Sequence, residues 1–171
     1  MARRMSRRQL CGTLVGGGLA LAALAQPRQA VAASGTAELI DRVNRYWREA
    51  GLAAWELRPD AALMDAAAWF AETHPFRPDL HEDRLERRYD ERLRAYGVRW
   101  GSEILYWTTN DGAAGLEEAF GWWRTSPPHR EQLHREDLRR VGAAAFRHTL
   151  DANGQPLDQP RTMYVYDLAP D

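Results

Sequence analysis

The chain has 171 residues, of which 44% are hydrophobic and 27% are charged, and its formal net charge is −1. This composition is that of a globular protein and excludes an intrinsically disordered chain. The length suits one domain with a single core and is short for two.

Residues 1–33 are predicted to form an export signal that is removed, which leaves 34–171 as a single mature domain. Four arginines precede an apolar run over 10–25, and small residues at 30–32 suit cleavage. The run is short for a membrane span. Because Arg7 and Arg8 stand directly before this weakly apolar run, it resembles a twin-arginine signal, with an ordinary secretory signal as the alternative. We therefore expect a periplasmic or secreted protein without a stable membrane anchor after cleavage.

Removal of this signal changes the charge and the cysteine content of the protein. It takes away five of the 23 basic residues and none of the 24 acidic residues, so the net charge falls from −1 to −6. A domain with this acidic balance is not expected to bind nucleic acid, because it lacks a basic footprint. The only cysteine, Cys11, lies in the signal, so the mature domain has no disulfide.

Five helices are predicted in the mature chain from apolar residues at helical spacing and from their capping residues. Asp60 is a good N-cap for the second helix, and Ser126 followed by proline begins the fifth. The charged residues of the third helix are expected to form a solvated face. The predicted ranges are 36–50, 61–73, 81–96, 114–125 and 127–135.

Three segments have the composition of β-strands, at 100–109, 141–150 and 161–168. The last two are separated by Asn153-Gly154, a turn signal, and are expected to form a hairpin. His148 is expected on the strand surface. Helices, a strand, more helices and a hairpin in this order indicate an α+β fold. We expect an αβα sandwich with a central, mainly antiparallel sheet flanked by helices.

Three polar residues are candidates for a common site. Glu103 stands at the start of an otherwise apolar strand, His129 lies in the first turn of the fifth helix, and His81 lies before the strand. A glutamate and two imidazoles in one cleft can share protons or bind a divalent cation such as zinc. The helix N-terminus favours the neutral form of His129, which is the form that binds a metal.

These segments, in this order, resemble the CAP superfamily of cysteine-rich secretory, antigen 5 and pathogenesis-related proteins, in its bacterial, cysteine-poor SCP-like branch. The likeness covers about residues 37–168 and rests on Gly101-Ser102-Glu103, on Trp123, Ser126, Pro127, His129 and Arg130, and on Val141-Gly142. The resemblance implies a cleft with two histidines and one or two glutamates. By this likeness Glu103 is the glutamate, His129 the second histidine and His81 the first, with His74 as the alternative. The family's second glutamate would fall near Ser126 and is missing.

From the residues and the resemblance we expect an exported, monomeric CAP-domain protein that binds a small or lipid ligand, a metal or an envelope partner through His81, Glu103 and His129. We do not expect an enzyme, and no residue is assigned as catalytic. The alternative is a metal-assisted hydrolase of peptide or cell-wall material, with Glu103 as general base or ligand. A purely structural role is a third hypothesis. Four aromatic residues are candidates for the rim of the cleft or for the core: Trp100, Tyr106, Trp107 and Trp122.

Overall fold

The computed structural model describes residues 31–52, 56–74, 81–83, 85–151 and 153–171. Most of the predicted export signal, residues 1–30, therefore lies outside the described residues. In the part that is described, no helix is both long and apolar enough to cross a membrane.

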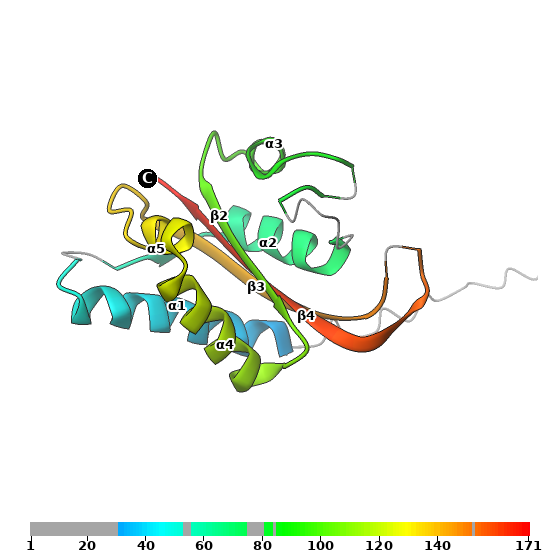
Figure 1. Ribbon diagram of the computed structural model, residues 1–171. Helices are drawn as coiled ribbons and strands as arrows, with labels where there is room; N and C mark the ends of the chain where they lie inside the picture. The colour runs from blue at the N-terminus through cyan, green and yellow to red at the C-terminus, as the bar shows by residue number, and fades with distance from the viewer. Residues whose placement is uncertain (1–30, 53–55, 75–80, 84, 152) are drawn as a thin grey trace, which may run out of the picture.

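The described residues form a four-stranded mixed sheet with five helices around it (Figure 1). The strand order is β1-β3-β4-β2, in which β1 runs parallel to β3 and the other neighbours are antiparallel. This arrangement confirms the α+β fold and the mainly antiparallel sheet expected from the sequence. The helices are α1 (Val31–Glu49), α2 (Ala61–Thr73), α3 (Tyr89–Ala95), α4 (Gly112–Thr125) and α5 (Pro127–Leu133); the strands are β1 (Arg58–Pro59), β2 (Ser102–Thr108), β3 (Arg140–Leu150) and β4 (Pro156–Ala169).

Helices cover both faces of the sheet. On one face, α1, α4 and α5 pack over the largest core cluster, which includes the fully buried Trp123 and Tyr166. On the other face, α2 packs Phe70 against Val165, and α3 adds Leu93 nearby. Since successive strand residues point to opposite faces, β2 and β4 each supply side chains to both cores. Figure 1 shows the sheet running diagonally, with α1 and α4 on the side away from α2 and α3.

One glycine sets the distance between α2 and the sheet. A Cβ atom at Gly142 of β3 would lie only 2.1 Å from the carbonyl carbon of Leu63 and 2.2 Å from its oxygen. The backbone of α2 therefore lies directly on β3, and only a residue without a side chain fits between them. The N-terminus of α2 is capped as predicted, because Asp60 accepts a 3.0 Å hydrogen bond from the backbone N–H of Leu63.

The predicted helix over 81–96 is too long. Only Tyr89–Ala95 is helical, and the preceding described residues form a turn around the buried Asp83. The Asp83 carboxylate accepts the backbone N–H groups of Leu85 and Arg87, and Glu86 has a left-handed φ of 61°. These local bonds compete with the helix and replace its first turns.

Candidate functional site

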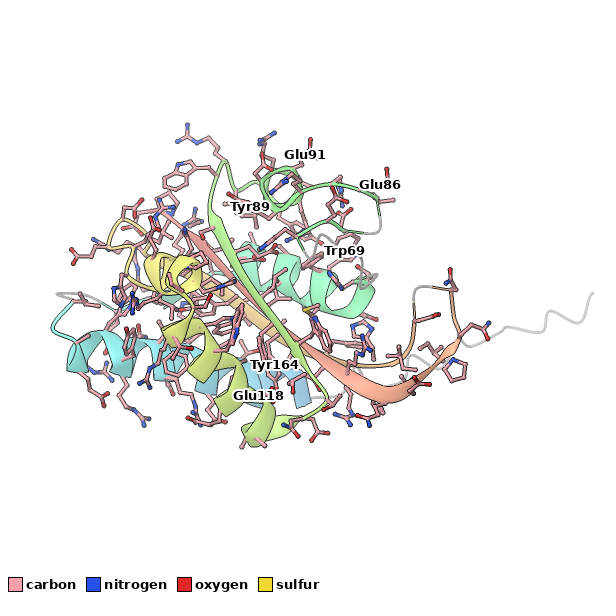
Figure 2. All side chains as sticks on the ribbon, viewed as in Figure 1. Trp69, Glu86, Tyr89, Glu91, Glu118 and Tyr164 are labelled. Atoms are coloured by element: carbon pink, nitrogen blue, oxygen red, sulfur yellow. The ribbon has the colours of Figure 1, made fainter. Side chains whose placement is uncertain are left out.

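A cavity of about 260 Å³ opens where β2 begins, at the end of the sheet that also holds the C-terminus (Figure 1). Because β2 is an edge strand, the cavity lies across that edge and takes its walls from both faces of the sheet. Figure 2 shows Tyr89 between α3 and β2. The cavity is lined by His81, Arg88 and Tyr89 on the α3 side, by Ser102 and Glu103 of β2, and by Pro128, His129, Gln132 and Arg135 on the α5 side.

Glu103 provides the only carboxylate in this lining, and its side chain is fully buried. His81 approaches one carboxylate oxygen, with 2.9 Å between Nδ1 and Oε1. Arg92 of α3 donates Nη2–H to the other oxygen, Oε2. When His81 donates its Nδ1–H to the carboxylate, Nε2 of the neutral ring becomes a hydrogen-bond acceptor.

His129 faces Glu103 across the cavity from the first turn of α5. Its Nδ1 lies 2.8 Å from Oγ of Ser126, and its ring lies 4.4 Å from that of Trp122, centroid to centroid. Burial lowers the pKa of His129 from its ordinary value of 6.5. The neutral form predicted from the sequence is thus favoured, and loss of solvation is a cause.

Ser102 connects β2 to the α5 side of the cavity. Its hydroxyl donates a 2.6 Å hydrogen bond to Oε1 of Gln132. These adjacent residues of β2 therefore belong to opposite walls of the cavity, since Ser102 points toward α5 while Glu103 points toward α3.

Two buried charges behind Glu103 were not predicted from the sequence. Arg92 is fully buried, and its guanidinium carbon lies 3.6 Å from the centre of the Phe70 ring. Asp167 of β4 is the direct cross-strand neighbour of Glu103 and is also fully buried. Neither Asp167 oxygen has a hydrogen-bond partner among the described residues. Burial raises the pKa of Asp167 to about 7, and the positive charge of Arg92 opposes this rise.

The cavity side chains do not fit the zinc site expected from the sequence. Zinc requires three or four His, Cys or carboxylate ligands that converge at about 2.0–2.3 Å. Within the ranges that the structure describes, no three such side chains are placed in this way. Both oxygens of Glu103 are already bound, one by Arg92 and one by His81. Among the described residues, the cavity therefore offers no ligand set that fits the zinc ion of a metal-assisted hydrolase.

The structure brings His81, Glu103 and His129 into one cavity, and binding by them stays a prediction. His74, the alternative to His81, is buried against Phe70 at 5.0 Å between rings and does not line the cavity. The expectation that His148 lies on the surface is wrong. It is only 8% exposed, and its Nε2 lies 2.7 Å from the carbonyl oxygen of Ala71.

The candidate rim aromatics divide into two groups. Trp100, Trp107 and Trp122 are each more than a third exposed, so a core role is wrong for these three, whereas Tyr106 is half-buried. Trp122 packs on His129, and Trp100 lies beneath Arg135 at 5.2 Å, so both adjoin the cavity walls. Trp107 lies four residues beyond Glu103 along β2 and stacks with Arg161 instead.

Comparison with known proteins gives a family and a fold. A model of the CAP family, described as the cysteine-rich secretory protein family, matches residues 40–155. A search of curated proteins finds no match. Among solved structures, an outer surface protein of Borrelia burgdorferi is similar, with a TM-score of 0.55 and 17% identity over 81% of this chain and 94% of that protein.

A second similar structure is an extracellular protein of Bacillus anthracis that contains an SCP domain. It has a TM-score of 0.59 and 15% identity over 82% of this chain. The match covers 41% of that protein, so this chain spans about two fifths of its length. At these identities the two structures establish the shared fold.

Proposed function

Because the chain belongs to the CAP family of cysteine-rich secretory proteins, we propose that it is an exported binding protein that holds a small polar ligand in the cavity between α3 and α5. One observation carries the proposal. Polar side chains from three distant segments, around 81, 103 and 129, meet in one cavity around a fully buried carboxylate. Burying a carboxylate costs free energy. Buried ionisable side chains are found more often in functional sites than elsewhere in a protein.

The cavity lining favours a ligand that carries an anionic group. Its charged side chains are Glu103, whose two oxygens are bound within the protein, and the arginines Arg88 and Arg135. Arg135 also pairs with Asp137 at 2.6 Å and 3.0 Å, which uses two of its five donors. Guanidinium groups bind carboxylates and phosphates with good geometry.

The size of the cavity limits the ligand. A volume of about 260 Å³ is slightly below the range of roughly 300–1,000 Å³ that is usual for small-molecule sites. The exposed rings of Trp100 and Trp122 beside the walls offer further apolar contact. We therefore propose a compact carboxylate or phosphate compound, or the anionic end of a longer molecule.

Export is part of the proposal. The basic and apolar segment over 1–33 supports it, as do the surface and extracellular locations named for the two similar structures. Fusion of residues 1–33 to a reporter would test this step independently of ligand binding. We expect secretion of the reporter, with loss of secretion when Arg7 and Arg8 are both replaced by lysine if the twin-arginine route is used.

Titration of the protein with acetate and inorganic phosphate, followed by imidazole NMR signals, tests the binding site. We expect saturable shifts of the His81 and His129 signals, while His148, which contacts the carbonyl of Ala71 and does not line the cavity, serves as an internal control. Arg135→Gln should weaken the effect, and Arg124→Gln, an exposed arginine on α4, should not. Equal response of His81, His129 and His148, or no response, would contradict the proposal.

A further inference from the structure

A permanent positive charge is built into the protein directly behind the cavity. Arg92 is fully buried, donates to Oε2 of Glu103, and is covered by the ring of Phe70. Arginine stays protonated at every physiological pH. The carboxylate that lines the cavity therefore has a fixed cationic partner on its inner side.

The charges around Arg92 form two separate sets. Asp83 and Arg87 satisfy each other, with 2.8 Å between Oδ2 and Nε, and Asp83 also accepts backbone N–H groups. This pair is neutral by itself. Arg92 is left facing Glu103 of β2 and Asp167 of β4, two carboxylates on neighbouring strands.

Asp167 is the second carboxylate that faces Arg92. It is buried with no hydrogen-bond partner among the described side chains and backbone groups, and its electrostatic partner is Arg92. An isolated buried charge is strongly disfavoured, whereas charges of opposite sign stabilise each other. Glu103, joined by Asp167 above the pKa of about 7 at which Asp167 ionises, therefore holds the guanidinium at the back of the cavity, where neither solvent nor a ligand competes for it.

We propose that Arg92 takes the place of a metal ion in this site: its guanidinium is the fixed counter-charge of Glu103, and the cavity binds its ligand without a divalent cation. The inference deepens the proposed function and rests on it for the identity of the binding cavity. A divalent cation would have to approach Glu103 against the charge of Arg92 and replace a contact that is fully buried. The oxygen that Arg92 does not bind, Oε1, faces His81.

The proposal assigns each member of the group a role in binding. Arg92 fixes the Glu103 carboxylate so that Oε1 orients His81, whose side chain lines the cavity. The positive charges that reach the cavity surface are those of Arg88 and Arg135. The ligand thus contacts an imidazole and two guanidinium groups rather than a metal ion with a free coordination position.

Zinc titration of the wild-type protein and of the charge-matched variant Arg92→Met/Asp167→Asn tests the inference. The titrations are done at pH 8, above the pKa of Asp167, so that the variant loses one positive and one negative charge and keeps its net charge, while Glu103 loses its inner partner. We expect no zinc-dependent shift of the His81 signal in the wild type and at least tenfold tighter zinc binding at His81 in the variant. If that variant does not fold, Arg92→Gln/Asp167→Asn replaces it, because glutamine still donates to Glu103 without the charge.

Equal zinc affinity in wild type and variant, whether tight or undetectable, would overturn the role of Arg92. The matched control is Arg94→Met/Asp90→Asn, an exposed pair on the same helix, which should bind zinc as the wild type does. Acetate and phosphate titrations of the same samples separate the two proposals. Wild type that binds neither anion contradicts the proposed function, whereas wild type that binds zinc through His81 contradicts only this inference.

Discussion

Replacement of Asp167 by asparagine should change how the stability of the protein depends on pH. Asp167 lies in the core between Glu103 of β2 and Gly142 of β3, with Arg92 of α3 as the facing charge. Its pKa is raised to about 7 in the folded protein, against an ordinary value of 3.8. Asparagine has nearly the same shape and does not titrate.

The direction in which stability changes with pH follows from the protons bound by the folded and unfolded states. Between pH 3.8 and pH 7 the folded protein keeps a proton on Asp167 that the unfolded chain has lost. The stability that Asp167 contributes is therefore fully present below 3.8, its pKa in the unfolded chain. It is lost as the pH rises through about 7, its pKa in the folded protein. One pKa unit corresponds to about 1.36 kcal/mol, so the contribution to the free energy of unfolding falls by about 2–3 kcal/mol between pH 5 and pH 8.

Urea unfolding followed by tryptophan fluorescence at pH 5, 6, 7 and 8 measures this effect. We expect the free energy of unfolding of Asp167→Asn to rise relative to wild type by about 2–3 kcal/mol over this range. Other groups that titrate, including the histidines, are common to both proteins and cancel in the difference. Asp158→Asn, at an exposed position of the same strand, should follow the wild type. A constant difference between wild type and Asp167→Asn at all four pH values would refute the reasoning.

Three further predictions concern packing and protonation. Gly142→Ala should lower the free energy of unfolding by roughly 1–3 kcal/mol, because the new Cβ overlaps the Leu63 backbone; an unchanged urea midpoint would contradict it. Gly121→Ala, which meets no atom within 4 Å inside α4, should instead raise it by about 0.5–1 kcal/mol in the same assay. An NMR titration of His129 should give a midpoint below 6.5, because burial disfavours the imidazolium, and a midpoint above 6.5 would be inconsistent with its position.

The parts of the site that depend on local sequence were predictable. Ser126 followed by two prolines places His129 in the first turn of a helix, and the apolar strand after Gly101 carries Glu103. Helix and strand signals of this kind act within a few residues, so they are visible in one sequence. The antiparallel hairpin of β3 and β4 was predictable from the turn at Asn153-Gly154 for the same reason.

The charges behind the cavity depend on tertiary packing and were missed. Arg92 lies in a stretch rich in arginine and acid, where a solvated face is the usual outcome, yet it is fully buried beneath Phe70 from another helix. Asp167 has no local partner that would mark it as buried. His148 was misplaced in the same way, because its contact is the carbonyl of Ala71, 77 residues earlier in the chain. Such contacts are set by which surfaces meet, and sequence spacing does not encode them.

The position of the cavity across the edge strand also determines how its shape can change by substitution. The two walls belong to separate outer layers, and only Ser102 and Glu103 in the lining come from the sheet. Substitutions on α3 or α5 can widen or narrow the opening while every hydrogen bond between strands stays in place. The shape of the cavity can in this way change on an unchanged scaffold, with the adjustment made in and beside the two short helices.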